Sequence, residues 1–346
     1  MNRIVALLKR VDDRIALQIY DILDGLTLKE IEAIKAGNYT TKRLISLRDS
    51  LKELQNEVTS VTTSVLGDEG KKLAAYELER TRDIAIAMGA EALGSSVSVN
   101  QVYAAAMSRP MLGRHIRDHV RDLSTKYRKL IMDAITEGYV MGESTSKIMT
   151  RIRGTVQYKR SDGLFYKRNG ALERLVVRNS ISHISGVASM ESYKELGLKQ
   201  YYLSPVFDGR TSDICRSWNS PEIQYFEVGK GPLPPFHPGG CRTIPLPRVK
   251  GDRTAPKPFV NDTRPVKDIP KDERGDKIGV TNAKTFEAHL KRQSAALQKE
   301  WLGPTRYKLW KAGMPLGKFA DPRKGVVYNL EQLRAKNAEI FKAAGI

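Results

Sequence analysis

Two cysteines and a histidine are the residues of this chain whose types and spacing best suit metal or thiol chemistry. Cys215 lies in the stretch DGRTSDICRSW, Cys241 lies in PPFHPGGCRTI, and His237 comes four positions before Cys241. Thiolate sulfur and imidazole nitrogen are ligands that zinc binds in structural sites. Because Gly239 and Gly240 permit a tight turn, the spacing favours His237 and Cys241 reaching one centre. A structural zinc ion is therefore one interpretation of this group.

A zinc site of this kind needs a fourth ligand, and two carboxylates lie near enough in the sequence to supply it. Asp208 and Asp213 both precede Cys215 by a few residues. With Asp208, the set would comprise two sulfurs, one nitrogen and one oxygen, which is chemically reasonable for zinc. The predicted ligands are therefore Cys215, His237, Cys241 and Asp208.

Three other interpretations of the same residues stay open. The two cysteines could form a disulfide or lie close together as reduced thiols. His237 could serve as the base for a cysteine nucleophile, although no oxyanion-hole loop is evident in the sequence. In the last interpretation the loop is purely structural. The cysteines then pack as small hydrophobic residues, and Asp208 makes a bidentate pair with Arg210 or Arg242.

Sequence signatures of several large enzyme classes are missing. The chain contains no P-loop, no GxGxxG after a strand and no HExxH, which are motifs for phosphates, dinucleotides and catalytic zinc. Paired carboxylates with clear acid–base spacing are also missing. We therefore predict a binding protein and not an enzyme. The alternative is a metal-dependent hydrolase, a nuclease or peptidase, that uses His237, Cys241 and Asp208.

The charge of the chain indicates a polyanionic partner. Its 346 residues include 58 lysines and arginines against 39 aspartates and glutamates, which gives a formal net charge of +19. A field of this size attracts polyanions, of which nucleic acid is the usual one. The sequence therefore predicts non-specific contact with double-stranded DNA. A basic surface that serves solubility, or that meets an acidic protein, is the alternative.

Cysteine usage and hydropathy bear on the cellular compartment. Two cysteines cannot build a disulfide framework, which indicates synthesis in a reducing cytosol. The sequence has no apolar run of about 18 residues, so we expect no membrane span. We interpret the N-terminal stretch MNRIVALLKRVDDR as an amphipathic helix, because charge returns at Lys9 and Arg10 and no cleavage site of a signal peptide follows.

The elements that must position the Cys/His residues are mostly helical over the first two hundred positions. In the stretch 43–65, apolar residues recur at a spacing of three and four, which predicts a bundle helix or a coiled-coil seam. The same pattern predicts helices at 114–138 and 172–196, and the aromatic run 200–207 predicts a strand. The apolar residues of the first stretch are Leu44, Leu47, Leu51, Leu54, Val58, Val61 and Val65.

A short hairpin interrupts the predicted helices. Asp162-Gly163 is a two-residue turn signal flanked by Tyr158 and Phe165. Basic residues interleaved with aromatic ones suit contact with nucleic acid, and a solvated hairpin tip is the alternative. The predicted nucleic-acid contacts are Lys159, Arg160, Lys167 and Arg168.

The predicted organisation has four segments. Residues 1–109 form a helical region, and 110–247 form the core that carries the Cys/His residues. Residues 248–282 are rich in Pro, Lys, Arg and Asp, which is typical of an extended linker or arm. Residues 283–346 form a C-terminal helical tail. The predicted fold class is mainly α with a small α+β motif region: an elongated helical bundle, a short hairpin, a Cys/His-containing loop module, an extended basic arm and C-terminal helices.

The pattern FDGRTSDICRSWN followed by PPFHPGGCRTIP resembles the signature of the phage head morphogenesis proteins. These are minor head proteins similar to phage Mu protein F and to the SPP1 minor head protein. The resemblance is specific over about 110–247 and looser from 283 to the C-terminus. Where many relatives carry further cysteines, this chain has Ser212 and Thr243. The residues that carry the resemblance are Asp208, Arg210, Thr211, Cys215, Pro234, Pro235, His237, Pro238, Cys241 and Arg242.

The resemblance implies a structural role in the virion. Such proteins attach to the portal or inner capsid during head assembly and can contact DNA. It implies a portal protein, a major capsid protein or a scaffold protein as partner. It also implies a location inside the head or at the portal vertex, after assembly in the host cytoplasm. A host DNA-binding protein is a further alternative, which terminase and portal genes next to this one would exclude.

Overall fold

The computed structural model describes residues 2–36, 38, 41–90, 97–249, 254–264 and 266–346. The chain divides into two compact units, and each unit is built from two separate stretches of sequence. Unit 1 comprises Met1–Gly70 and Gly113–Ser180, and unit 2 comprises Lys71–Leu112 and Ile181–Ile346.

Two helices run from one unit into the other along the chain. They are α3 (Lys42–Ala87) and α8 (Arg178–Glu195). The four predicted segments 1–109, 110–247, 248–282 and 283–346 therefore do not coincide with the compact units. Helical periodicity records which face of a helix is buried, but not which distant segment covers it.

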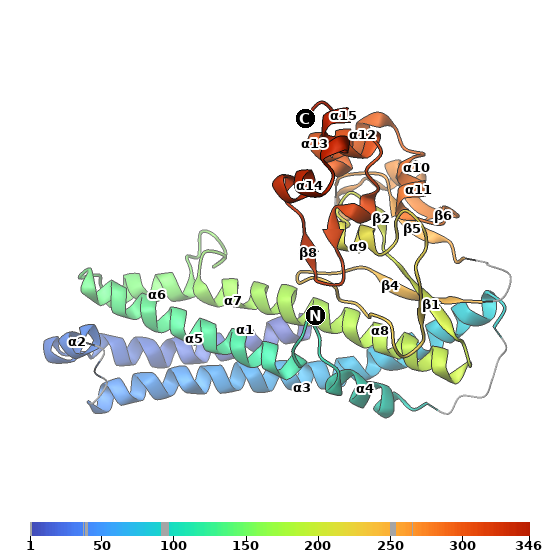
Figure 1. Cartoon of the computed structure of the whole chain (residues 1–346). Helices are drawn as coiled ribbons and strands as arrows, with labels where there is room; N and C mark the ends of the chain where they lie inside the picture. The colour runs from blue at the N-terminus through green and yellow to red at the C-terminus, as the bar shows by residue number, and fades with distance from the viewer. Residues whose placement is uncertain (1, 37, 39–40, 91–96, 250–253, 265) are drawn as a thin grey trace. The chain divides into compact units, whose positions relative to one another are not determined.

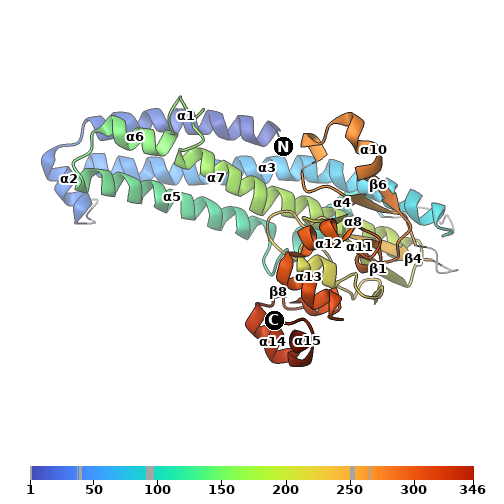
Figure 2. The same ribbon diagram turned by 90° about the horizontal axis from the view of Figure 1, so that it is seen from above.

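Unit 1 is a helical bundle in which α1, α3, α5 and α7 run alongside one another (Figures 1 and 2). The predicted apolar stripe of α3 is confirmed: Val61 is half-buried and the other six residues are buried. Besides the first part of α3, its elements are α1 (Asn2–Asp24), α2 (Leu28–Lys35), α5 (Ile116–Val140), α6 (Thr145–Arg153), α7 (Leu164–Leu172) and the π-helix η1 (Glu173–Val177).

The predicted hairpin around Asp162-Gly163 is wrong. Turns occupy this region, and Gly163 leads directly into α7. The carboxylate of Asp162 accepts hydrogen bonds from the N–H and the hydroxyl of Thr155, at 2.9 and 3.1 Å, and so closes a compact loop. Gly163 lies so close to Arg153 that a Cβ would come within 2.4 Å of its backbone. The dipeptide does mark a turn, but the flanking residues do not pair as strands.

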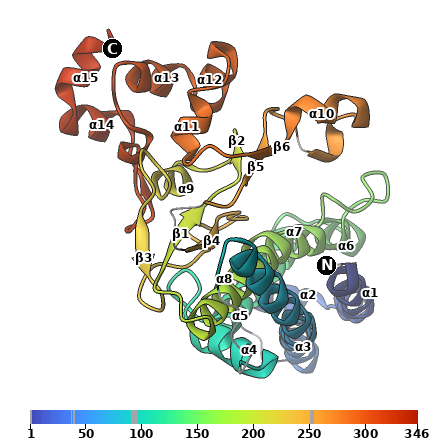
Figure 3. The same cartoon turned by 90° about the vertical axis from the view of Figure 1, so that its right-hand side faces the viewer.

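Unit 2 contains two three-stranded sheets, a two-stranded sheet made of residues 320–321 and 326–327, and the residues of the Cys/His group. In the first sheet, β1 (Gln200–Ser204) is the central strand, and β3 (Tyr225–Glu227) and β4 (Ile244–Arg248) pair with it antiparallel. The predicted strand at 200–207 is therefore confirmed over β1. It is followed by β2 (Phe207–Asp208), which begins the second sheet. Figure 3 shows the first sheet together with the C-terminal helices of this unit.

The predicted arm at 248–282 is wrong over its described residues, because this segment completes the second sheet. β5 (Lys257–Val260) pairs with β2 in parallel and with β6 (Ile278–Thr281) antiparallel. Some of its charged residues pair with one another: the Arg264 guanidinium lies 2.6 Å from Glu273 and 2.8 Å from Asp262. The remaining elements of the segment are η2 (Val266–Asp268), η3 (Lys271–Glu273) and α10 (Arg274–Lys277).

The C-terminal tail is helical, as predicted, and encloses an aromatic core. Trp301, Leu309 and Trp310 are buried in this core beside Phe207 and Phe286. Its elements are α11 (Phe286–Leu290), α12 (Ala295–Leu302), α13 (Pro304–Lys311), η4 (Leu316–Lys318), β7 (Ala320–Asp321), β8 (Val326–Val327), α14 (Leu330–Lys336) and α15 (Ala338–Ala343).

The rest of unit 2 is helical. The second part of α3, α4 (Val99–Ser108) and α8 share a cluster of buried apolar side chains. The fold class, mainly α with a small α+β region, is therefore confirmed. Among the described helices, none combines the length and the apolar character that crossing a bilayer requires.

Candidate metal centre

Cys215 is positioned by the short helix α9 (Asp213–Ser217). Ser212 caps this helix, because its hydroxyl oxygen accepts a hydrogen bond from the N–H of Cys215 at 3.2 Å. The helix follows the tight turn after β2, so that Cys215 comes seven positions after Asp208. The thiol is buried. The cap thus fixes the first turn of α9 and with it the direction of the Cys215 side chain.

His237 and Cys241 are positioned by the loop that precedes β4. Gly239 and Gly240 have φ values of 94° and 109°, which side chains with a Cβ rarely adopt. The predicted role of these two glycines in a tight turn is therefore confirmed. The turn brings His237 and Cys241 to the same side of the loop, and Cys241 lies three positions before the first residue of β4.

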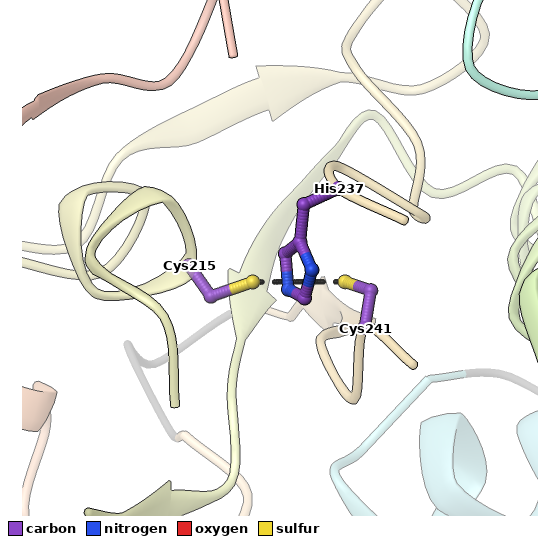
Figure 4. A group of neighbouring side chains, drawn as sticks. All are labelled: Cys215, His237 and Cys241. Atoms are coloured by element: carbon purple, nitrogen blue, oxygen red, sulfur yellow. Dashed lines mark hydrogen bonds between the residues drawn. The ribbon is translucent and has the colours of Figure 1, made fainter. Parts of the chain in front are cut away.

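The three predicted nitrogen and sulfur ligands come together. The Sγ atoms of Cys215 and Cys241 lie 3.6 Å apart, and the ligand atoms of Cys215, His237 and Cys241 all lie within 4.8 Å of one another (Figure 4). Two sulfurs bound at about 2.3 Å in a tetrahedral arrangement would lie about 3.8 Å apart. The group could therefore hold a metal ion with little movement. Both cysteines are free thiols in this structure, and not a disulfide.

The electrostatics of the group favour a thiolate on one of the two cysteines. Hydrogen bonding to Cys215, and to a lesser degree to His237, lowers the pKa of Cys241 well below the usual range of a thiol. The same contact with Cys241, together with burial, raises the pKa of Cys215. Hydrogen bonding to Cys241 also raises the pKa of His237. A thiolate on Cys241 is the form that would bind a metal ion, which would take the place of the two hydrogen-bond donors.

The prediction of Asp208 as fourth metal ligand is wrong, because both of its carboxylate oxygens are engaged elsewhere. The guanidinium of Arg242 donates to them in bidentate fashion, at 2.6 and 2.7 Å. The N–H of Arg210 and the hydroxyl of Thr211 each lie 3.0 Å from Oδ1. Asp208 is fully buried, and it is not a member of the ligand group. The alternative prediction, a bidentate pair with Arg242, is confirmed.

Asp213, the other carboxylate considered as a ligand, also belongs to an ion-pair network. Its oxygens lie 3.3 Å from the guanidinium of Arg216 and 2.7 Å from that of Arg306. Arg216 is itself buried and donates to the backbone carbonyls of Gly209 and Trp301, at 3.1 and 3.2 Å. These contacts fasten α9 to the C-terminal helices. No local sequence pattern predicts these contacts, because Arg306 lies ninety positions after Arg216.

A small hollow adjoins the Cys/His group. Cys215 and His237 line it, together with Arg210, Ser212 and Thr243. Ser212 and Thr243 stand where many of the resembling proteins have cysteines. A metal ion held by Cys215, His237 and Cys241 would thus lie beside a small open volume lined in part by hydroxyl groups. A water molecule would be a suitable fourth ligand there.

The four predicted nucleic-acid contacts in unit 1 differ in their exposure to solvent. Lys159 and Lys167 are exposed, and they stay predictions. Arg160 is half-buried and lies 3.4 Å from Asp13. Arg168 does not fit the prediction, because its side chain is 2% exposed and forms an ion pair with buried Asp12. Arg168 lies inside the helical bundle because the expected hairpin is instead the start of α7.

Comparison with known proteins does not identify a family for this chain. No family model, no curated protein and no solved structure matches this chain.

Proposed function

We propose that this chain is a structural minor head protein of a tailed phage. It would join the portal or the inner capsid during head assembly and contact DNA without sequence preference. The observation that supports this proposal is the arrangement of the residues that carry the resemblance. Asp208 pairs with Arg242, and Cys215 lies beside His237 and Cys241. Two stretches separated by a loop are thereby held together, which is the work of a structural clasp.

Zinc is the ion that best fits the Cys/His group within this proposal. Two thiolates and one imidazole form a donor set that suits zinc, whereas calcium and magnesium favour oxygen ligands. Cys215, His237 and Cys241 would hold the ion. It would cross-link α9 to the loop before β4, and its binding free energy would add to the stability of the fold.

A structural role fits the surroundings of this group better than hydrolysis does. Metal-dependent hydrolysis needs a general base near the open ligand position. Among the described residues that line the adjoining hollow, no carboxylate is found. Asp208 is held by Arg242 and is fully buried. Nuclease or peptidase turnover with added zinc or manganese, abolished by His237→Ala, would instead establish the hydrolase alternative.

Elemental analysis of the purified protein tests the metal assignment. We expect about one zinc per chain, as for a single structural site, and its loss in Cys241→Ser and Cys215→Ser. Asp208→Asn is the matched control, because this carboxylate lies in the same motif but outside the ligand group. Wild-type protein without zinc, or Asp208→Asn protein that loses zinc while it remains folded, would contradict the assignment.

Location of the protein in phage particles tests the head assignment. We expect peptides of this chain in purified heads at low copy number, and density for it at or near the portal vertex in a map of the particle. Heads that form with normal composition, and that lack the chain although infected cells produce it, would refute the proposal.

The dependence of DNA affinity on salt tests the proposed DNA contact. Neutralisation of phosphates by lysine and arginine releases counterions, so the association constant should fall steeply as salt rises. The net charge of +19 is the reason to expect this behaviour. Affinity that is flat between low and high salt, or no binding at low salt, would contradict this part of the proposal.

A further inference from the structure

Unit 2 contains a second and larger pocket, which shares no lining residue with the hollow beside the Cys/His group. Its volume is about 610 Å³, which is within the range of small-molecule sites. Two stretches of chain form its walls, one at the end of α9 and one that runs from η4 to the end of α14. Its lining residues include Trp218, Ser220, Gly317, Lys318, Asp321, Arg323, Tyr328 and Lys336.

The pocket carries an excess of positive charge. Lys318, Arg323 and Lys336 line it and are exposed. Asp321 is the one carboxylate among the described residues that line it, and Oδ1 of Asp321 accepts from the N–H groups of Arg323 and Lys324, both at 3.1 Å. That carboxylate therefore fixes its own turn. Within the described residues, the side chains of Lys318 and Arg323 form no ion pair.

Trp218, which has a buried indole N–H, is also among the residues that line the pocket. Trp218 is 3% exposed and packs against Phe226 and Phe236, with ring centroids 5.5 and 5.2 Å away. Its indole N–H has no hydrogen-bond partner among the described residues. A buried donor without a partner costs free energy, so such groups mark places where a ligand or an ordered water binds. Here the donor accompanies three cations, which suits an anion.

The two walls of the pocket are held together independently of any ligand. The carboxylate of Glu287 accepts from the hydroxyl of Ser220 at 2.6 Å and from the N–H of Leu316 at 3.1 Å. Gly317 lies against the carbonyl oxygen of Ser220, where a Cβ would come within 2.7 Å. The pocket is therefore largely preformed, so a ligand would not bear the cost of ordering it.

We propose that this pocket binds a phosphate group of a nucleic-acid strand. Lys318, Arg323 and Lys336 would surround the phosphate, and Trp218 would donate to it. Tyr328 is half-buried beside these cations, with the Lys336 ammonium 4.3 Å from its ring centroid. Cations next to an aromatic ring are the combination that proteins use for single strands, and they favour nucleic acid over an acidic peptide.

This inference rests on the DNA contact of the proposed function and gives it a location. The positions predicted from the sequence lie in unit 1, at 159–168, whereas every lining residue of this pocket lies in unit 2. Because the pocket would enclose one phosphate, it should favour a flexible strand that can bend to place a phosphate inside it. We therefore expect single strands to bind at least as tightly as duplex.

The test compares two triple variants with equal loss of charge. The pocket variant changes Lys318, Arg323 and Lys336 to glutamine. The control variant changes Lys299, Lys308 and Lys342 to glutamine as well, and these residues are exposed and lie outside the pocket. Binding of a short labelled oligothymidylate is followed by fluorescence anisotropy at several salt concentrations. The thermal midpoint of each variant shows that it is folded.

The expected result is a selective loss in the pocket variant. Each neutralised phosphate of a single strand contributes about 0.7 to the salt slope, so loss of the one phosphate held in this pocket should lower the slope by about 0.7. Affinity at low salt should fall about tenfold or more, whereas the control variant should keep its slope. Trp218→Phe keeps the charge and the ring, and should weaken binding about tenfold through the lost N–H.

Each remaining outcome overturns the inference. Equal losses in the two triple variants would assign the binding to overall charge. Competition by polyglutamate as strong as that by the oligonucleotide would point to an acidic peptide as the ligand. Wild-type protein that binds no nucleic acid would overturn the DNA contact of the proposed function as well. Wild-type binding that the pocket variant retains in full would overturn the pocket alone.

Discussion

Replacement of Arg242 by methionine should destabilise unit 2 more than any change to the exposed charges around it. Arg242 gives Asp208 two short charge-assisted hydrogen bonds, and the Asp208 carboxylate is fully buried. Arg242→Met keeps much of the side-chain volume and removes both donors. A buried carboxylate would then be left with the N–H of Arg210, the hydroxyl of Thr211 and a longer contact to the Arg210 guanidinium at 3.5 Å.

The size of the effect follows from the burial of the two partners. Removal of one member of a buried ion pair costs about 3–5 kcal/mol, because the other charge is left without compensation. Arg242 is itself 36% exposed in its side chain, which places the cost near the lower end, about 3 kcal/mol. For a unit of this size, that corresponds to a fall in the thermal midpoint of about 6–12 °C.

The loss should depend on pH in a defined direction. Burial alone raises the pKa of Asp208, but the hydrogen bonds and charge of Arg242 outweigh burial, and the pKa lies below its usual value. In the wild type, this stabilisation is present above the unfolded pKa of about 3.9 and is lost as pH falls through the folded pKa. Without Arg242, burial should raise the pKa of Asp208. As pH falls, protonation of this carboxyl then removes the cost of a buried, uncompensated charge in the variant. The stability difference should therefore shrink from pH 7 toward pH 4.

Chemical unfolding of both proteins at several pH values measures this difference. Arg210→Met is the matched control, because its guanidinium is 42% exposed and lies 3.5 Å from Asp208. Exposed ion pairs contribute about 0–1 kcal/mol, so the control should lose less than about 1 kcal/mol of unfolding free energy. Arg242→Met protein with a free energy of unfolding within about 0.5 kcal/mol of wild type, the range of ordinary surface substitutions, would contradict this role of the ion pair. A difference that grows toward pH 4 would refute it as well.

Three further substitutions test other parts of the structure. Arg168→Met leaves a buried carboxylate of α1 unpaired and should cost unit 1 more than about 2 kcal/mol in chemical unfolding, with exposed Lys167→Met as control. Gly317→Ala places a Cβ within 2.7 Å of a carbonyl oxygen, should cost about 1–3 kcal/mol by overpacking, and is measured by thermal unfolding. Burial lowers the pKa of Lys257 to about 8, so wild-type stability should rise from pH 8 toward pH 10 as the folded state loses this proton. Lys257→Met should abolish that rise and be more stable at pH 7.

The sequence was sufficient where the decisive interactions are local or periodic. The apolar stripe of α3 is buried because residues three and four apart share one face of a helix. The turn at Gly239-Gly240 has the positive φ values that glycine supplies. Trp301 and Trp310 are buried in the tail core, as large aromatic side chains in an amphipathic segment require.

The sequence was insufficient where a partner lies far along the chain. The segment 248–282 has the composition of a linker, yet β5 pairs with β2, which lies about fifty positions earlier. Asp262, Arg264, Glu273 and Lys277 of that segment form an ion-pair cluster, and composition cannot show such pairing. Asp208 is another example. Its distance in sequence from Cys215 suits a metal ligand, but Arg242 takes up both of its oxygens.

The Asp208–Arg242 pair and the Cys/His group fasten the same two stretches of chain. Asp208 ends β2, and Arg242 directly follows Cys241, so the ion pair and the thiols act within a few residues of each other on both sides. Classical zinc fingers are unfolded without metal because nothing else closes their loops. In this chain, a buried bidentate ion pair and the α9 contacts of Arg216 close the loop without metal. Removal of a bound metal should therefore lower stability but leave the fold intact. The clasp does not depend on a fourth protein ligand, which is consistent with hydroxyl residues at Ser212 and Thr243.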